Sequence, residues 1–219
     1  MIQACLETMR SANAEDLFEI LPRIGVLRDS RFGKPLLELL EQKDDLKRRQ
    51  FAAYALGAMG TKEFLEPLKK AFRETRDSHG AAARDFQMAI IEAIGALGDD
   101  AAAEFFLPIL SEGPPGKQSA RLHRCIIESL GALAQQGGGR SLEVLLSLTQ
   151  RGDPELRALA LSELSVAYWH RPNQIDQATL QRILELTNDR SPVVAESALA
   201  ALESLADVGC HRAEKLFKK

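Results

Sequence analysis

Apolar residues recur along the chain at the spacing of a helix surface, in six successive stretches. One residue of each stretch serves as position zero: Gly25, Gly57, Gly95, Gly131, Ser165 and Glu203. Positions −5, −4, −1 and +2 are apolar in all six stretches, which makes 24 positions. Spacings of 3, 4 and 7 residues place these side chains on one stripe of a helix. The pattern therefore predicts six amphipathic helices that bury the stripe.

A second amphipathic stretch follows each of these helices after a short break. The second stretches cover about 31–42, 62–74, 101–111, 140–151 and 176–188, with a shorter one at 211–218. Thr61, Asp153-Pro154 and Ser191-Pro192 provide a capping side chain at or before a helix start. The repeating unit is thus helix–turn–helix, with a period of about 36 residues.

Position zero is glycine in four of the six stretches, although glycine in a helix costs about 1 kcal/mol against alanine. Position +1 is also small in volume, being alanine, serine or valine. We expect that the glycine lets a neighbouring helix approach closely.

The composition agrees with an all-α fold. Aromatic residues make up only 5% of the 219 residues, and alanine and leucine, which favour helices, dominate. No run approaches 18 uncharged apolar residues, and residues 1–11 have no signal-peptide core. Cys5, Cys125 and Cys210 are far apart and form no metal-binding spacing, so we expect a reducing, cytoplasmic location.

The repeating unit resembles HEAT repeats, in particular the short bacterial kind found in phycobilin-lyase-like proteins. The resemblance rests on RRQFAAYALGAMG (48–60), MAIIEAIGALGD (88–99) and DPELRALALSEL (153–164). The family places an aspartate shortly before an arginine at the start of the first helix, as in the pairs Asp45/Arg49 and Asp153/Arg157. The other repeats depart from this pattern, with Gln87, His123 and Ala195 at the arginine position.

The resemblance implies an all-α, right-handed solenoid of about six HEAT-like hairpins in one domain, 1–219. Residues 1–12 are expected to form a cap helix or a partial repeat. The repeats are expected at 13–43, 44–76, 81–112, 116–152, 153–189 and 190–219.

No motif of catalysis, metal binding or phosphate binding is present in the sequence. The triple glycine at 137–139 lacks the lysine of a phosphate-binding loop. The four histidines lie far apart in different repeats, and Cys125 lies beside the apolar stripe, where a packed thiol is expected. We therefore predict a protein that is not an enzyme and has no metal or other cofactor.

The second helices line the concave face in HEAT folds, so their outer residues are candidates for contacting a partner protein. These candidates are Lys34, Glu38, Glu66, Lys69, Lys70, Arg73, Glu104 and Arg182. An anion or partner site at the edge is possible at Arg84, Arg121 and Arg124, but a ladder of structural Arg–Asp pairs is the preferred interpretation. The loops 74–83 and 111–118 are a second candidate surface.

The predicted function is a non-catalytic scaffold or adaptor that binds another protein on the concave face or the loop edge. One alternative is a subunit that handles a bilin chromophore, as the family resemblance suggests. A second alternative is binding of nucleic acid, which the formal charge of −3 disfavours. No small-molecule substrate or membrane partner is evident. The partner's identity, the oligomeric state and whether the chain is part of a longer protein stay open.

Overall fold

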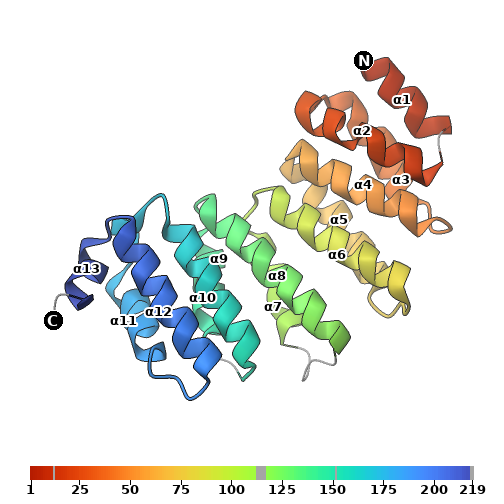
Figure 1. Cartoon of the computed structure of the whole chain (residues 1–219). Helices are drawn as coiled ribbons and strands as arrows, with labels where there is room; N and C mark the ends of the chain where they lie inside the picture. The colour runs from red at the N-terminus through yellow and green to blue at the C-terminus, as the bar shows by residue number, and fades with distance from the viewer. Residues whose placement is uncertain (12, 112–116, 151, 218–219) are drawn as a thin grey trace. The chain divides into compact units, whose positions relative to one another are not determined.

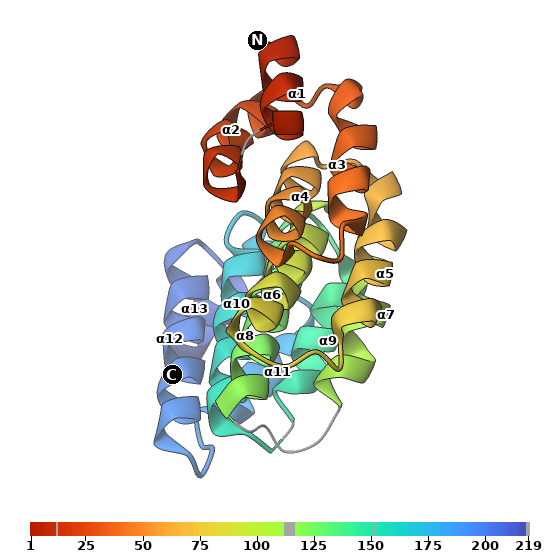
Figure 2. The ribbon, with the colours of Figure 1, turned by 90° about the vertical axis from the view of Figure 1, so that its right-hand side faces the viewer.

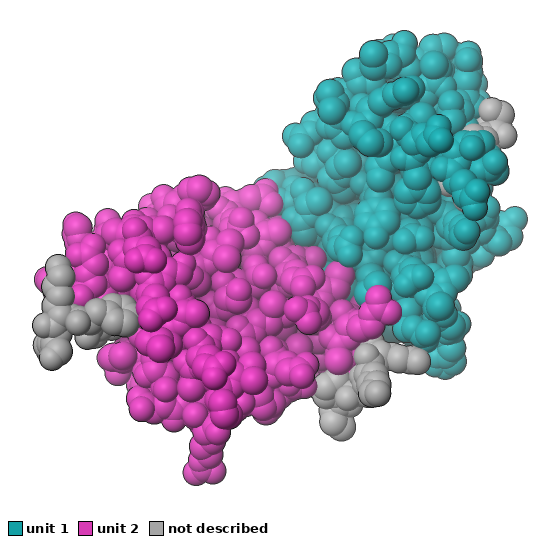
Figure 3. All heavy atoms as spheres, in the orientation of Figure 1, with its two compact units in different colours: residues 1–105 teal, residues 106–219 magenta. Residues whose placement is uncertain are grey.

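The computed structural model describes all residues except 12, 112–116, 151 and 218–219. The described residues form thirteen α-helices and three short 3-10 helices, with no β-strand among them (Figure 1). The helices pack as neighbours in the order of the chain. This confirms the prediction of an all-α helical-repeat fold. The chain divides into two compact units, residues 1–105 and 106–219, shown in two colours in Figure 3.

Unit 1 contains the helix α1 and two complete hairpins, followed by the first helix of the third hairpin. The helices are α1 (Ile2–Ser11), α2 (Ala14–Leu27), α3 (Gly33–Glu41), α4 (Leu46–Met59), α5 (Leu65–Thr75) and α6 (Ala81–Ala96). The first helices α2, α4 and α6 pack on one another in that order. The second helices α3 and α5 also contact each other, and they follow one another along one side of the unit (Figure 2).

Unit 2 repeats this arrangement with the remaining hairpins. Its helices are α8 (Lys117–Gln135), α9 (Gly139–Leu148), α10 (Pro154–Tyr168), α11 (Gln177–Leu186), α12 (Pro192–Asp207) and α13 (His211–Phe217). The first helices α8, α10 and α12 pack side by side, and α9 and α11 each pack on the first helix that follows. The division between the units falls within α7 (Ala102–Leu110).

Side chains cap several helices at the predicted starts. The Asp153 carboxylate accepts hydrogen bonds from the backbone N–H groups of Glu155 and Leu156 at the start of α10. The 3-10 helices η1 (Ser30–Phe32), η2 (Lys62–Phe64) and η3 (Pro172–Gln174) connect helices. Thr61 and Ser191 stand at the N-cap positions of η2 and α12, but neither side chain makes the capping hydrogen bond that the sequence suggested.

The apolar stripe forms the core of both units. Of the 24 stripe positions, 21 are buried, while Leu21 and Leu27 are half-buried and Leu199 is 45% exposed. Leu199 lies on α12, and among the described residues no further first helix covers that flank. The predicted burial is therefore confirmed in full for the four middle first helices and in part for the first and the last one.

Two of the position-zero glycines, Gly57 and Gly131, show two kinds of close contact. A Cβ atom at Gly57 in α4 would lie 2.7 Å from the Cα atom of Ala93 in α6, so only glycine allows this approach of two backbones. A Cβ atom at Gly131 in α8 would lie 1.9 Å from a carboxylate oxygen of Glu163 in α10. The expected close backbone approach is thus confirmed at Gly57, whereas at Gly131 a side chain occupies the space.

A search for membrane spans covered the described residues and found none, since their helices are too short or too polar to cross a bilayer.

Candidate functional site

A groove of about 550 Å³ lies on the face that the second helices of unit 1 form. The lining residues come from α3 and α5: Lys34, Leu37, Glu38, Glu41, Glu66, Pro67, Lys70 and Arg73. Leu37 and Pro67 are the half-buried apolar members, and the six charged residues are exposed. The groove therefore offers an apolar surface within a charged rim.

The rim contains exposed ion pairs. Lys70 on α5 reaches Glu41 on α3 with an N–O distance of 3.7 Å, which connects the two walls. Lys34 and Glu38 lie 4.0 Å apart on successive turns of α3. Exposed pairs of this kind contribute about 0–1 kcal/mol each, so an incoming charge can displace them easily.

A buried arginine lies beneath the groove. The Arg49 side chain is 3% exposed, and its Nε donates to the Leu40 carbonyl at 2.7 Å. One Nη donates to the Glu74 carboxylate at 3.4 Å, and the guanidinium lies 4.6 Å from the centroid of the Phe86 ring. Burial lowers the pKa of Arg49, but an arginine keeps its charge at neutral pH.

A small void of about 30 Å³ lies between this arginine and the groove. Its lining includes Arg49 and Glu74, and it shares Leu37, Pro67 and Lys70 with the larger groove. The void is about the size of one water molecule. The buried positive charge is therefore close to the apolar surface of the groove.

Five of the eight predicted partner residues line the groove: Lys34, Glu38, Glu66, Lys70 and Arg73. Lys69 was expected to be exposed and is instead buried, because its Nζ turns towards Glu66 at 3.0 Å and lies 5.8 Å from the centroid of the Phe105 ring. Glu104 is exposed on α7 and does not line the groove.

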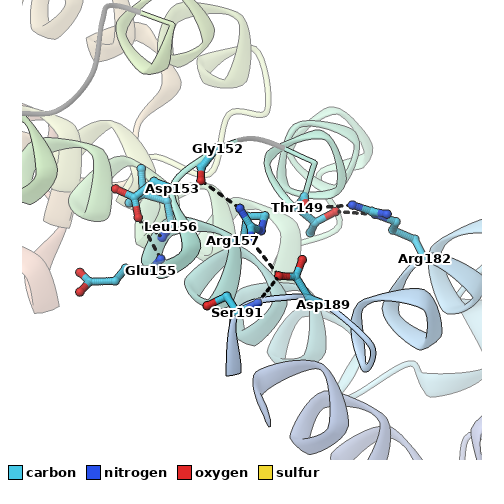
Figure 4. Close-up of polar contacts among 9 residues, drawn as sticks. All are labelled: Thr149, Gly152, Asp153, Glu155, Leu156, Arg157, Arg182, Asp189 and Ser191. Carbon is cyan, nitrogen blue, oxygen red and sulfur yellow. Dashed lines mark hydrogen bonds and ion pairs between the residues drawn. The ribbon is translucent and has the colours of Figure 1, made fainter. Parts of the chain in front are cut away.

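Arg182 belongs to unit 2 and has a structural contact there. Its guanidinium donates to the carbonyl and the hydroxyl of Thr149 at 3.0 and 3.3 Å (Figure 4). Thr149 follows the last residue of α9, so Arg182 satisfies a carbonyl at a helix end that would otherwise lack a donor.

The preferred interpretation of the first-helix arginines, a ladder of structural pairs, is confirmed at Arg157. This side chain lies 2.9 Å from the Asp189 carboxylate and 3.0 Å from the Gly152 carbonyl (Figure 4). The backbone N–H of Ser191 and then Arg157 lower the pKa of Asp189. The acidic partners differ from the expected ones, since Asp153 caps a helix and Arg49 pairs with Glu74.

Arg121 and Arg124 lie together on α8, at a second groove of about 620 Å³ on the first helices of unit 2. Arg124 pairs with Glu128 at 3.2 Å on the same helix. The third member of the predicted edge site, Arg84, is half-buried on α6 of unit 1, so unit 2 by itself contains two of the three.

Sequence reasoning missed Glu41, Leu37 and Pro67 in the groove, and Arg49 beneath it. A signal for Glu41 was present, because charges recur at steps of 4 and 3 residues in both second helices. In α3 they are Lys34, Glu38 and Glu41, and in α5 they are Glu66, Lys70 and Arg73, each 32 residues later. The position of Arg49 under the groove depends on packing and gave no such signal.

The cysteine of α8 is packed, as expected, and so is the histidine of this helix. His123 is buried, and its Nε2–H donates to the Ile109 carbonyl at 3.2 Å. Burial lowers the pKa of His123, so the neutral ring is favoured. Cys125 is buried with a free thiol. Within the described residues, no three His, Cys, Asp or Glu side chains meet in a way that could hold a metal ion.

No curated protein matches the chain. Among solved structures, that of human deoxyhypusine hydroxylase in complex with glycerol is similar, with 18% identity over 93% of this chain and 83% of that one. Its TM-score of 0.35 is too low to support any conclusion about function. The phycobilin-lyase-like subtype is not confirmed. Residues 33–122 match the family model for HEAT repeats, which supports a HEAT-repeat architecture for this segment.

Proposed function

We propose that this protein is a non-catalytic scaffold that binds a peptide segment of another protein in the groove between α3 and α5. HEAT repeats form helical scaffolds for protein interaction, and the groove is the observation that supports this particular site. Five of the residues that the sequence marked as partner contacts lie around its apolar surface.

The composition of the groove suits a polypeptide. Leu37 and Pro67 provide apolar area, which contributes most of the binding free energy when a partner covers it. The exposed charges around them select the partner's orientation and raise the association rate, while they contribute less to affinity.

The test is reversal of three charges: Glu66→Lys, Lys70→Glu and Arg73→Glu in one chain. Wild type and variant are used to capture proteins from a lysate of the source organism. Each protein that only the wild type captures is then purified, and its affinity is measured by titration calorimetry. We expect affinity to fall at least tenfold in the variant, since three rim contacts become repulsive.

The matched control has the same change in net charge away from the groove: Glu63→Lys, Lys62→Glu and Lys47→Glu, which are all exposed in unit 1. It should bind like the wild type. Unchanged affinity in the groove variant would contradict the proposal and favour the predicted loop edge, 74–83 and 111–118, of which residues 112–116 lie outside the described part.

We further propose that the chain acts by binding and not by turnover. The described histidines and cysteines occupy packed or separate positions, and the Glu74 carboxylate beneath the groove pairs with Arg49. Turnover of any substrate by the purified chain, abolished by His123→Ala in a variant that still folds, would overturn this proposal.

A further inference from the structure

The charged side chains around the α3–α5 groove are equal in number but are not all paired with one another. The groove and the void beneath it are lined by four carboxylates, Glu38, Glu41, Glu66 and Glu74, and by four cations, Lys34, Arg49, Lys70 and Arg73. Three of the carboxylates pair with a lining cation, while Glu66 pairs with Lys69, which lies outside the lining. One lining cation is therefore left without a carboxylate.

Arg73 is the cation without a carboxylate among the described residues. Its guanidinium lies 5.6 Å from the centroid of the Phe105 ring, a contact that leaves its N–H donors available. Arg73 lies one helical turn after Lys70 on α5, so both head groups reach the same end of the groove. Within the part of the chain that the structure describes, Lys70 pairs with Glu41 alone, at 3.7 Å, and an incoming carboxylate can replace this exposed partner.

The buried guanidinium of Arg49 does not add to the unpaired positive charge, because the Glu74 carboxylate lies 3.4 Å from it and compensates its charge. The cations of the groove that an incoming carboxylate can engage are therefore Lys70 and Arg73. The apolar part of the groove, at Leu37 and Pro67, lies less than two helical turns from Lys70 and Arg73.

We infer that the groove binds acidic–apolar segments: peptides that place an aspartate or glutamate against Lys70 and Arg73 and a large apolar side chain on Leu37 and Pro67. This inference rests on the proposed function, because it names the class of partner for the same groove. The distance along α5 from Pro67 is about 4.5 Å to Lys70 and about 9 Å to Arg73, at 1.5 Å per residue. The two side chains of the partner are therefore one to three residues apart in an extended segment, or three to four apart in a helix.

The experiment is selection from a random library of 12-residue peptides displayed on phage, with the full chain as bait. A parallel selection uses Leu37→Asp, which puts a charge into the apolar surface, and circular dichroism confirms that this variant folds. Peptides that bind the wild type and not Leu37→Asp are synthesised with a fluorophore and titrated by fluorescence anisotropy. We expect an acidic and a large apolar residue at the stated spacing in most of them.

Charge variants then test the site of the carboxylate. Lys70→Glu with Arg73→Glu should weaken the selected peptides at least tenfold, and Lys47→Glu with Lys62→Glu, which has the same change in net charge, should not. Replacing the acidic residue of a peptide by its amide should lower the affinity for the wild type by a similar factor. The same replacement should not lower the affinity for the Lys70→Glu, Arg73→Glu chain.

The outcomes separate the inference from the proposed function. Selected peptides that depend on Leu37 but contain no acidic residue, or contain arginine or lysine instead, would contradict the inference. The proposed function of the groove as a peptide-binding site would still stand. If no selected peptide depends on Leu37, both the inference and the proposed groove fail.

Discussion

At the scale of single residues, the most unusual group is the carboxylate of Glu163 in the contact between α8 and α10. Glu163 is at position −2 of its repeat, where four of the other five repeats have alanine or serine and the first has Arg23. It lies against Gly131, and burial followed by the nearby Glu128 raises its pKa from 4.5 to about 7. The folded protein thus holds the proton more tightly than the unfolded chain does.

The raised pKa predicts a loss of stability as pH rises. Below pH 4.5 both states are protonated, and between 4.5 and about 7 only the unfolded chain loses the proton, so the free energy of unfolding falls over this window. Glu163→Gln removes this pH dependence and should stabilise the protein by about 1–2 kcal/mol at pH 8. This gain is smaller than the full pKa shift implies, because solvent reaches the carboxylate and screens its charge. Urea unfolding at pH 5 and pH 8 measures this. A variant as pH-dependent as the wild type in this window would contradict it.

Gly57 and Gly131, which both stand at position zero of their repeats, allow a matched comparison. Gly57→Ala puts a methyl group 2.7 Å from a backbone atom of Ala93, so the helices must separate, and we expect a loss of about 1–3 kcal/mol despite the better helix propensity. Gly131→Ala meets the end of the flexible Glu163 side chain, which can move, so its cost should be clearly smaller. Thermal unfolding of both variants measures the difference, and equal costs would show that backbone proximity is not what requires glycine.

At the scale of elements, three first helices share a contact made by the residue at position −8, the position of the arginine in the HEAT pattern. In α4, α6 and α8 the side chain of this residue donates a hydrogen bond to a backbone carbonyl near the end of the preceding second helix. Arg49 donates to Leu40 near the end of α3, and Gln87 donates to Thr75 at the end of α5. His123 donates to Ile109 near the end of α7. Gln87 and His123 stand in place of the arginine but are also hydrogen-bond donors, so these carbonyls near the helix end stay satisfied. Ala195, the third replacement, has no such donor.

His123 provides the test of this cap. His123→Leu leaves the Ile109 carbonyl buried without its donor and should cost about 1–3 kcal/mol at pH 7.5, whereas His123→Gln keeps a donor and should cost less. The folded pKa lies below 6.5, so the contribution of the neutral ring is complete above that pH and is lost as pH falls through the folded pKa. His123→Gln should therefore lose less stability than the wild type between pH 7.5 and 5.5. Equal losses in urea unfolding would argue against this role.

The packing of first helices predicts different costs for one substitution at two stripe positions. Leu130→Ala in α8 removes a fully buried side chain and should cost about 2–5 kcal/mol. Leu199→Ala in α12 removes a side chain that is 45% exposed and should cost less than about 1 kcal/mol. Chemical denaturation of both variants checks this, and a large cost at Leu199 would show that another element covers it in solution.

At the scale of the whole molecule, contacts connect each first helix mainly with its neighbours in the stack. Stability in such a protein is close to a sum over repeats and their interfaces. Leu56→Ala in α4 should therefore speed amide hydrogen exchange in α2, α4 and α6 and leave α10 and α12 close to the wild type. Leu164→Ala in α10 is the reciprocal control. Uniformly faster exchange after either change would mean that the repeats unfold as one unit.

The sequence by itself determined the helices, their order and the buried stripe. These features follow from the 3.6-residue period of a helix and from the recurrence of the unit, both of which are visible in residues close together in the chain. The charged residues along the groove also follow from this recurrence. Lys34, Glu38 and Glu41 in α3 are followed 32 residues later by Glu66, Lys70 and Arg73 in α5.

Only the tertiary structure decided which side chains meet. Arg157 pairs with Asp189 across 32 residues, the Lys69 ammonium lies over the Phe105 ring of α7, and Arg49 lies beneath the groove. Each of these contacts depends on how far one hairpin is shifted and rotated against the next. That offset is set by the volumes of the packed side chains and by close approaches such as Gly57 on Ala93, and the spacing of residues along the chain does not contain it.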